Sequence, residues 1–174
     1  MKATSKSRPD PAAKARAIEF YNAETYAPSE SVGYLMRRIM TIVSQEIERE
    51  LEPSGLTNAQ WVPLFKLSLG SATTGVELAR ECELDAGAIT RLLDRLEGKG
   101  LCRRERSSED RRVVNLEITN EGKQAVKVVP QVLSSVQNQL LDGFTVDEWK
   151  SLREFLHRIL DNAKSLQARS DSHA

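Results

Sequence analysis

Apolar residues recur at every third or fourth position through most of the chain, which is the spacing of one face of an α-helix. The first such run begins at Ser29 and ends at the Glu-Pro-Ser-Gly stretch 52–55. Its apolar stripe is wider than a single core face requires. The pattern predicts a helix that is either deeply buried or shared between a core and a second copy of the chain.

Three later helices are predicted to begin with a capping box, in which a threonine and a Glu or Gln three residues later bond to each other's backbone. The pairs are Thr57 with Gln60, Thr74 with Glu77, and Thr145 with Glu148. Another helix is predicted to begin after Asp85, a common N-cap residue, and to end before Gly100. Its core face carries Ile89, Leu92, Leu93 and Leu96.

The helices expected at 74–82 and 86–98 are short and are joined by residues 83–85, which is typical of a helix-turn-helix. After Gly100 the apolar spacing changes to every second residue, as in a strand. The segments LCRRER and VVNLEIT alternate in this way, and SSEDRR between them is predicted to be a turn. The predicted fold class is therefore mainly α with a small β-hairpin wing, a winged helix-turn-helix over residues 55–120.

Two long helices are predicted after the hairpin. The first occupies residues 121–140 and is interrupted by Pro130, and the second occupies residues 145–163. Residues 1–28 are expected to be an extension, polar and disordered at its start, with one short helix before Pro28. Residues 166–174 are expected to be a polar tail that frays.

The chain has 174 residues, of which 40% are apolar and 29% are charged, as in an ordinary soluble globular protein. No apolar run approaches the roughly 20 residues that a membrane span needs, and the N-terminus lacks the apolar segment of a secretory signal. The two cysteines, Cys82 and Cys102, have neither CxxC nor metal-ligand spacing. We therefore expect a cytoplasmic protein without a membrane partner or a bound metal.

Charge is distributed unevenly although the formal net charge is zero. Residues 86–112 contain eight Lys and Arg against five Asp and Glu, whereas residues 41–55 contain one Arg against four Glu. One segment is thus suited to contact phosphate groups and the other is not.

Catalytic chemistry has few candidates in this sequence. The two histidines, His157 and His173, belong to no recognisable Ser/His/Asp or Cys/His arrangement. The GSATTG stretch has the glycine spacing of a phosphate-binding loop, but Val76 stands where the lysine must be, and no strand is predicted before it. We expect no enzymatic activity and no cofactor.

The cysteines allow a second interpretation, a thiol-based redox sensor. Cys102 is expected to begin a strand beside Arg103 and Arg104, whose charge would lower the thiol pKa if the thiol were exposed. Cys82 falls on the predicted core face of its helix. The simpler interpretation is that both are small apolar side chains.

The outer face of the predicted helix 86–98 has the residue types of a DNA-reading surface. Small residues let the backbone approach base edges, threonine can bond a base or phosphate, and arginine can bind guanine with two hydrogen bonds. The residues are Ala86, Gly87, Ala88, Thr90, Arg91 and Arg95. A solvated helix face would explain them equally well on their own. The adjoining hairpin, with Arg111 and Arg112 at its tip, favours DNA.

Residues 90–123, TRLLDRLEGKGLCRRERSSEDRRVVNLEITNEGK, resemble the core of the MarR family of transcriptional regulators. The family's wing pattern D-x-R-x-x-x-x-x-L-T extends from Asp110 to Thr119, with Ile118 in place of leucine. The predicted elements between about Val32 and Ala163 also follow the family's order. Only the N-terminal extension and the C-terminal tail lie outside the resemblance.

The resemblance implies a MarR-type domain over residues 29–165, in which 29–54 and 121–165 are dimerisation helices. It implies a homodimer with two recognition helices in successive major grooves of a pseudo-palindromic operator and two wings in the flanking minor grooves. By position, Arg112 matches the wing arginine that enters the minor groove, and Asp110 matches the acid that holds it. Arg111 would then contact a phosphate or act as a second probe.

We therefore expect a homodimeric repressor of double-stranded DNA that a small ligand releases from its operator. The family resemblance implies a phenolic or aromatic carboxylate effector. Tyr34, Arg38 and Trp61 are candidate wall residues of its pocket, and each could equally be structural. The competing interpretation is a winged-helix protein-interaction module whose arginines pair with the acids of a partner.

Overall fold

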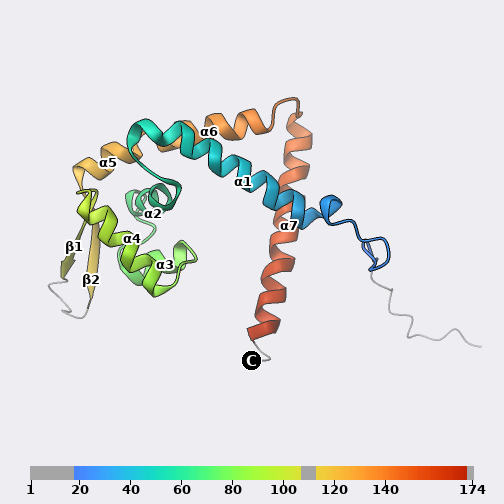
Figure 1. Ribbon diagram of the computed structural model, residues 1–174, viewed down its shortest axis with the longest axis horizontal. Coiled ribbons are helices and arrows are strands. Elements are labelled where there is room, and N and C mark those ends of the chain that lie inside the picture. The colour runs from blue at the N-terminus through green and yellow to red at the C-terminus, as the bar shows by residue number, and fades with distance from the viewer. Residues whose placement is uncertain (1–17, 107–112, 172–174) are drawn as a thin grey trace, which may run out of the picture. The chain divides into compact units, whose positions relative to one another are not determined.

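The computed structural model describes residues 18–106 and 113–171 (Figure 1). The chain divides into two compact units, the first ending at Met40 and the second beginning at Thr41. Helix α1, Val32–Leu51, contributes residues to both units.

The first unit begins with an extended segment that caps a helix. Residues 18–27 contain only a turn, so the short helix predicted before Pro28 is absent from this part of the chain. Asn22 explains the difference, because its side-chain oxygen accepts hydrogen bonds from Glu24 N (3.0 Å) and Thr25 N (2.9 Å), a local turn that competes with helix. The Tyr21 hydroxyl accepts a hydrogen bond from Val32 N at 3.1 Å, at the start of α1.

The second unit contains the remaining elements. In chain order these are η2 Glu52–Ser54, α2 Asn58–Ser68, α3 Gly75–Glu81, α4 Ala86–Gly98, β1 Cys102–Arg106, β2 Val114–Ile118, α5 Asn120–Val126, α6 Val129–Leu140 and α7 Val146–Asp171. In the first unit a short 3-10 helix, η1 Pro28–Glu30, precedes α1.

The predicted helix starts are confirmed. The capping boxes at Thr57 and Thr74 are formed, and Thr145 N donates to Glu148 Oε2 at 2.8 Å. Hydrogen bonds from the Thr73 backbone and side chain hold the pKa of Glu77 below its usual value. Asp85 Oδ1 accepts a hydrogen bond from Ala88 N at 2.7 Å, as expected of the N-cap of α4.

The apolar face of α4 forms the centre of the core. All four residues predicted for that face are buried, among them Leu96, which is fully enclosed. They pack in one cluster with Leu51, Leu64 and Leu78, which come from α1, α2 and α3. The core therefore fixes the rotation of α4 about its own axis, and with it the direction of the opposite face.

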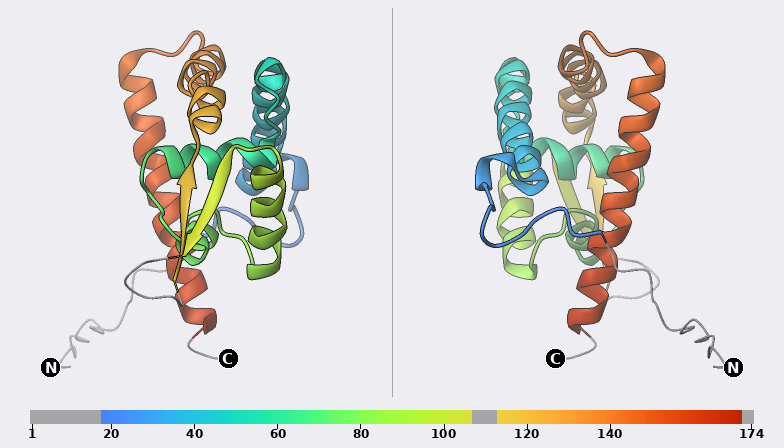
Figure 2. Two further views of the ribbon diagram at one scale, coloured as in Figure 1. Left: turned by 90° about the vertical axis from the view of Figure 1, so that its left-hand side faces the viewer. Right: turned by 90° about the vertical axis from the view of Figure 1, so that its right-hand side faces the viewer.

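The hairpin is a two-stranded antiparallel sheet that stands beside α4 (Figure 2). Cys102 pairs with Ile118 and Arg106 pairs with Val114 at the two ends of the register. The hairpin is also tied to the residues before α3, because Leu116 N donates to Thr73 O at 2.7 Å. The predicted fold class, a mainly helical protein with a winged helix-turn-helix, is confirmed.

The end of the chain differs from the prediction of two long helices. Residues 120–140 form two helices, α5 and α6, and Pro130 lies in the first turn of α6. A proline lacks the N–H that a helix interior needs, so it is accommodated at a helix start. The last helix, α7, continues to Asp171, so residues 166–171 are helical rather than a frayed tail.

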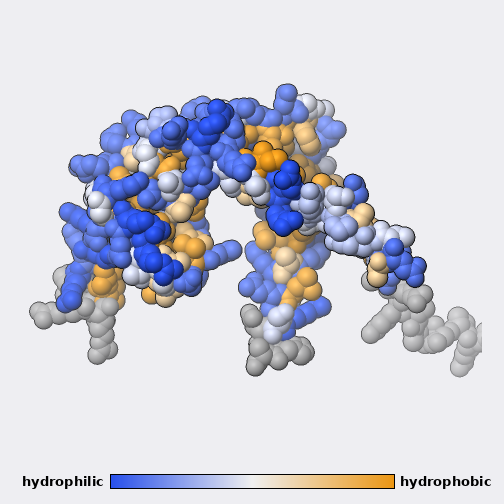
Figure 3. All heavy atoms as spheres, in the orientation of Figure 1, coloured by the Kyte–Doolittle hydropathy of each residue, from blue (hydrophilic) through white to orange (hydrophobic). Residues whose placement is uncertain are grey.

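Helix α7 has no buried residue in the described chain. Patches of apolar side chains follow the helix on the face shown in Figure 3. The exposed large apolar residues of α7 are Val146, Trp149, Phe155, Leu156, Leu160 and Leu166. None of the helices formed by residues 18–106 and 113–171 is both long and apolar enough to cross a membrane.

Candidate nucleic-acid interface

The outer face of α4 is opposite the buried stripe and open to solvent. Ala86, Gly87, Thr90, Arg91 and Arg95 are exposed there. Ala88 is half-buried and belongs to the edge of this face. The structure thus places all six residues predicted for the recognition helix at the surface or at its margin.

The first turn of α4 is small enough for the Arg91 side chain to lie across it. A Cβ atom added at Gly87 would be 3.2 Å from Arg91 Nη1 and 3.2 Å from Asp85 Oδ1. The missing side chain therefore leaves room for the guanidinium beside the N-cap carboxylate. Thr90 Oγ1 donates to Ala86 O at 2.7 Å, so its proton is used inside the helix and its oxygen can act as an acceptor.

Two basic residues near α4 are occupied by contacts within the fold. Lys99 Nζ donates to Gly55 O at 3.0 Å and to Gln60 Oε1 at 2.9 Å. Arg103 forms ion pairs within the hairpin, at 2.9 Å to Glu105 and 2.6 Å to Glu117. The charge of Arg103 is therefore compensated by acids, and the Lys99 ammonium donates to oxygens within the fold.

Arg104 joins the wing to the recognition helix. Its Nη1 atom lies 2.7 Å from Asp94 Oδ1 and 2.8 Å from Glu97 Oε2, and its Nη2 atom donates to Thr90 O at 3.3 Å. In the sequence, this arginine stands out only as a neighbour of Cys102. The signal for its role, an arginine on a strand facing two acids on a helix, becomes visible only when the tertiary contact is known.

The cations left for an external partner are on the outer face and at the end of β1. Arg91, Arg95 and Arg106 are exposed, and within the described residues none of them forms a hydrogen bond or an ion pair that compensates its charge. The wing-tip prediction concerned Asp110, Arg111 and Arg112, which lie outside the described residues. The described part of the interface thus presents positive charge from one helix and one strand.

The environment of the thiols contradicts the premise of the redox interpretation. Cys102 is only 2% exposed, and burial, helped by Glu97 and opposed by Arg104, raises its pKa to about 11. Burial also raises the pKa of Cys82, which is half-buried. The prediction required an exposed thiol, and this condition is not met: the Cys102 thiol is buried, and the lowering of its pKa by Arg104 is outweighed by burial. Both thiols are thus suited to packing.

The candidate ligand residues fall in different units. Tyr34 and Arg38 belong to the first unit, where Arg37 lies over the Tyr34 ring at 5.7 Å from its centroid. Trp61 belongs to the second unit, packs against the core and donates from Nε1 to Asn58 Oδ1 at 3.1 Å. Tyr34 and Trp61 therefore each have a local contact of their own, and a shared pocket stays a prediction.

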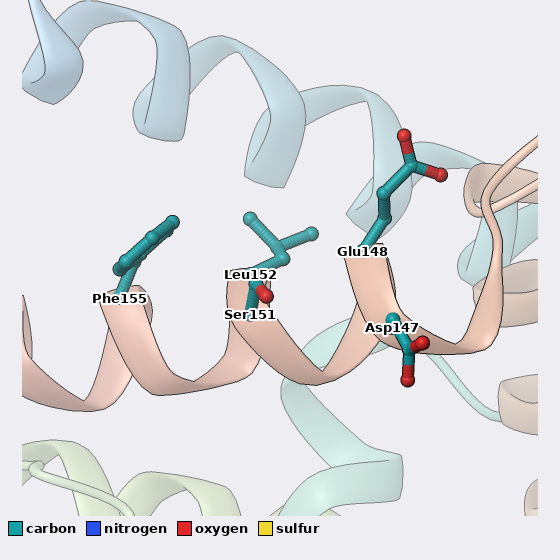
Figure 4. A pocket seen from close by; sticks show the side chains of 5 residues that line it. All are labelled: Asp147, Glu148, Ser151, Leu152 and Phe155. Atoms are coloured by element: carbon teal, nitrogen blue, oxygen red, sulfur yellow. The ribbon is translucent and has the colours of Figure 1, made fainter.

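Two hollows occur on the second unit. One, of about 700 Å³, lies between α3, α4 and the wing, with Val76, Leu93 and Val114 among its lining residues. The other, of about 400 Å³, lies on α7 alone, where Leu152 and Phe155 project from one side while Asp147 points away (Figure 4). A hollow lined by one helix has no opposite wall, which is typical of a surface that lacks its packing partner.

Residues 56–114 match the model of the MarR family. MepR from S. aureus, solved in complex with DNA, shares 23% identity and a TM-score of 0.71 over 76% of this chain and 98% of that one. A mutant MarR from E. coli, solved with operator DNA, shares 29% identity and a TM-score of 0.67 over 74% and 92%. BpsR from Bordetella bronchiseptica, whose DNA binding is regulated by 6-hydroxynicotinic acid, shares 24% identity and a TM-score of 0.69 over 78% of this chain and 97% of that one.

The family match covers the helix-turn-helix and the first strand of the wing, and the structural similarity covers most of the chain. Together they confirm the resemblance that the sequence showed. Residues 56–114 therefore match the MarR family of transcriptional regulators, and the chain shares the winged helix-turn-helix fold of MarR-family structures solved with DNA.

Proposed function

We propose that this protein regulates transcription by binding double-stranded DNA sequence-specifically, with α4 as its recognition helix. The observation that carries the proposal is the arrangement of α4, whose one face is fixed in the core while Arg91 and Arg95 project from the other. The similarity to MepR and MarR, both solved with DNA, supports the same assignment.

The residues proposed to contact DNA differ in their roles. Ala86, Gly87 and Ala88 allow close approach of the first turn, and Thr90 offers an acceptor. Arg91, which lies across that turn, is the candidate for reading a base, and Arg95, farther along the helix, is suited to a phosphate. In the wing, Arg112 remains the proposed minor-groove contact and Asp110 the acid that holds it, while Arg111 is proposed to contact a phosphate or to act as a second probe.

The active form is proposed to be a homodimer. A helix as long as α7 gains most of its stability from packing, yet it buries none of its apolar side chains within the chain. In the first unit, α1 likewise exposes Leu35, Met36 and Ile39. Contiguous exposed apolar surface of this kind marks an interaction site. A second copy would cover it symmetrically.

A two-fold symmetric dimer presents two copies of α4 and therefore reads a pseudo-palindrome. Half-sites one helical turn apart, about 10 base pairs between centres, are the geometric expectation for helix-turn-helix dimers. Occupancy of such an operator by the dimer would block transcription, so we propose a repressor.

The effector is proposed to be a small phenolic or aromatic carboxylate, with Tyr34, Arg38 and Trp61 as candidate contacts. BpsR, a protein of the same fold, responds to 6-hydroxynicotinic acid. Such a ligand must prefer the form that does not bind DNA, and DNA must weaken its binding by the same factor, typically about 5–150-fold. Calorimetry with a panel of aromatic acids tests this, and absence of heat from every member would contradict it.

Salt-dependent binding to a random-sequence duplex tests the DNA interface itself. The logarithm of the binding constant should fall linearly with the logarithm of salt concentration, by about 0.9 per neutralised phosphate. Replacing Arg95 by glutamine should make the slope shallower by about 1 for each copy of the chain. The control is Arg49→Gln in α1, because Arg49 is paired with Glu46 and Glu50 in the acidic segment. Binding without salt dependence would contradict the proposal.

A further inference from the structure

We propose that Arg104 is a positioning residue that clamps the wing to the recognition helix and thereby sets the sequence discrimination of the protein. The inference rests on the proposed DNA-binding function and deepens it. Arg104 is not proposed to contact DNA. Its role is to hold two DNA-contacting elements, α4 and the hairpin, at one fixed separation.

The contacts of Arg104 span two turns of α4. Its guanidinium reaches Thr90 O, Asp94 Oδ1 and Glu97 Oε2, at 3.3, 2.7 and 2.8 Å. Residues at these spacings lie on one side of a helix, so a single planar group can contact all of them. The backbone N of Arg104 also donates to Glu97 Oε1 at 3.0 Å. Strand β1 is thus fixed to α4 by both its main chain and its side chain.

Apolar packing does not replace this link on the outer side of the wing. A hollow of about 700 Å³ opens there between α3, α4 and the hairpin, and Thr90, Asp94 and Arg104 are among its lining residues. The clamp therefore bridges the margin of a hollow. Without it, the described part of the hairpin would keep its attachment at Thr73 and Thr74 and its packing on the core.

The guanidinium suits this role better than an ammonium group. Its donors lie in one rigid plane and can bond several acceptors at once, whereas lysine carries a single compact charge. The Arg104 side chain is also only 28% exposed, compared with 59% for Arg103. Its donors are therefore used by acceptors on α4 and are poorly placed to reach phosphate.

Arg103 provides a matched control on the same strand. Successive residues of a strand point to opposite faces, and Arg103 forms its ion pairs with Glu105 and Glu117 inside the hairpin. The two arginines thus carry the same charge and are adjacent in sequence. Of these two arginines, Arg104 is the one whose side chain contacts α4.

The contacts of Arg104 with α4 should matter most for the complex with operator DNA. Binding to an operator requires α4 and the wing to fit their grooves at the same time, whereas random DNA requires only positive charge near phosphates. A loosened wing should therefore reduce affinity for the operator much more than affinity for random duplex.

The first experiment measures the ratio of operator affinity to random-duplex affinity, with the operator obtained by selection on the wild-type protein. Arg104→Lys should lower this ratio about tenfold, the loss expected when a base contact is mispositioned. Its random-duplex affinity and salt slope should stay near wild type. Arg103→Lys should leave the ratio unchanged within about twofold.

The second experiment breaks the clamp from the other side with Glu97→Met. Removing a negative charge near DNA would strengthen binding to every duplex if electrostatics alone acted. If Arg104 positions the wing through Glu97, the ratio of operator affinity to random-duplex affinity should instead fall, as in Arg104→Lys. The affinity for random duplex should stay equal or rise. This variant also decides the question if Arg104→Lys does not fold, as judged by circular dichroism.

The outcomes separate the clamp from the proposed function. A wild-type protein that binds no duplex would refute the function itself. A wild-type protein that discriminates normally, with an unchanged ratio in both variants, would overturn the clamp. An equal loss on operator and random duplex in Arg104→Lys would make Arg104 a phosphate contact and also overturn it.

Discussion

Helices α4 and α7 expose different kinds of surface to solvent, polar and basic on α4 and partly apolar on α7. Helix α4 buries Ile89, Leu92, Leu93 and Leu96 in the core of its own chain and exposes a polar, basic face. Helix α7 is twice as long, with 26 residues against 13, and buries none of them. A recognition element must have its direction fixed before it meets DNA, so its support comes from within the chain. The exposed apolar side chains of α7 are instead available to the second copy proposed above.

The two regions also differ in the chemistry of their contacts. Charged side chains around α4 connect elements far apart in sequence, as Lys99 does with Gln60. On α7, Arg153 lies over the Trp149 ring at 4.9 Å and Lys150 pairs with Asp147, both contacts within the helix. The comparison therefore predicts that mutations near α4 change DNA binding, whereas mutations on α7 change assembly.

The largest effect is expected where α5 follows the wing. A methyl group at Gly122 in α5 would collide with the Leu101 carbonyl oxygen and lie 2.8 Å from Ile118 Cγ1. Since backbone cannot yield easily, Gly122→Ala should lower the free energy of unfolding by about 3 kcal/mol. The control Gly98→Ala meets nothing within 4 Å in α4 and should raise it by up to about 1 kcal/mol. Urea unfolding measures both, and equal stabilities would contradict the packing at Gly122.

The next effect tests the assembly role of α7. Leu160 is 49% exposed in the single chain, so Leu160→Lys costs the chain's own core little. Burial of one leucine stabilises by about 1.5–3 kcal/mol, and both copies lose it. Dimerisation should weaken by about 3 kcal/mol or more, measured by analytical ultracentrifugation. Asn162→Lys adds the same charge without removing a leucine, and an identical dissociation constant for the two variants would contradict the dimer interface.

A smaller effect is expected on the outer face of α4. Arg91→Ala should cost about 1–3 kcal/mol of operator binding and relax the preference at one position of each half-site. A profile of single-base operator variants measures this. A uniform loss over all positions would instead assign Arg91 to a phosphate.

The smallest effect concerns the thiols. With its pKa raised to about 11, Cys102 is protonated at neutral pH and should not react with a disulfide reagent in the folded protein. As the pH rises above the ordinary thiol value of about 8.5, the unfolded chain loses this proton first, so stability should fall there. Rapid labelling of Cys102 at pH 7.5, or loss of DNA binding on mild oxidation of a Cys82→Ser variant, would revive the redox interpretation.

Local signals made much of α4 predictable. Asp85 as N-cap, the spacing of its apolar residues and Gly100 after its end all act within a few residues of each other. Gly100 has a φ of 70°, a conformation that glycine adopts without strain. The winged helix could therefore be predicted from the sequence before any contact was known.

Other features depend on contacts that sequence spacing does not encode. Arg104 meets Glu97 only after the chain has turned at Gly100 and begun β1. The thiol of Cys102 was judged by its neighbours in sequence, whereas its pKa depends on the face of the strand that it occupies. Residues 166–171 are polar but contain good helix formers, so their composition fitted both a tail and the end of a helix.

Selection of binders from a random duplex library tests the central claim most directly. We expect enrichment of a pseudo-palindrome with half-sites about one helical turn apart, and Arg91→Ala should lose one conserved position from each half-site. Weak binding with no enriched motif would contradict a DNA-reading α4 and favour a protein-interaction module.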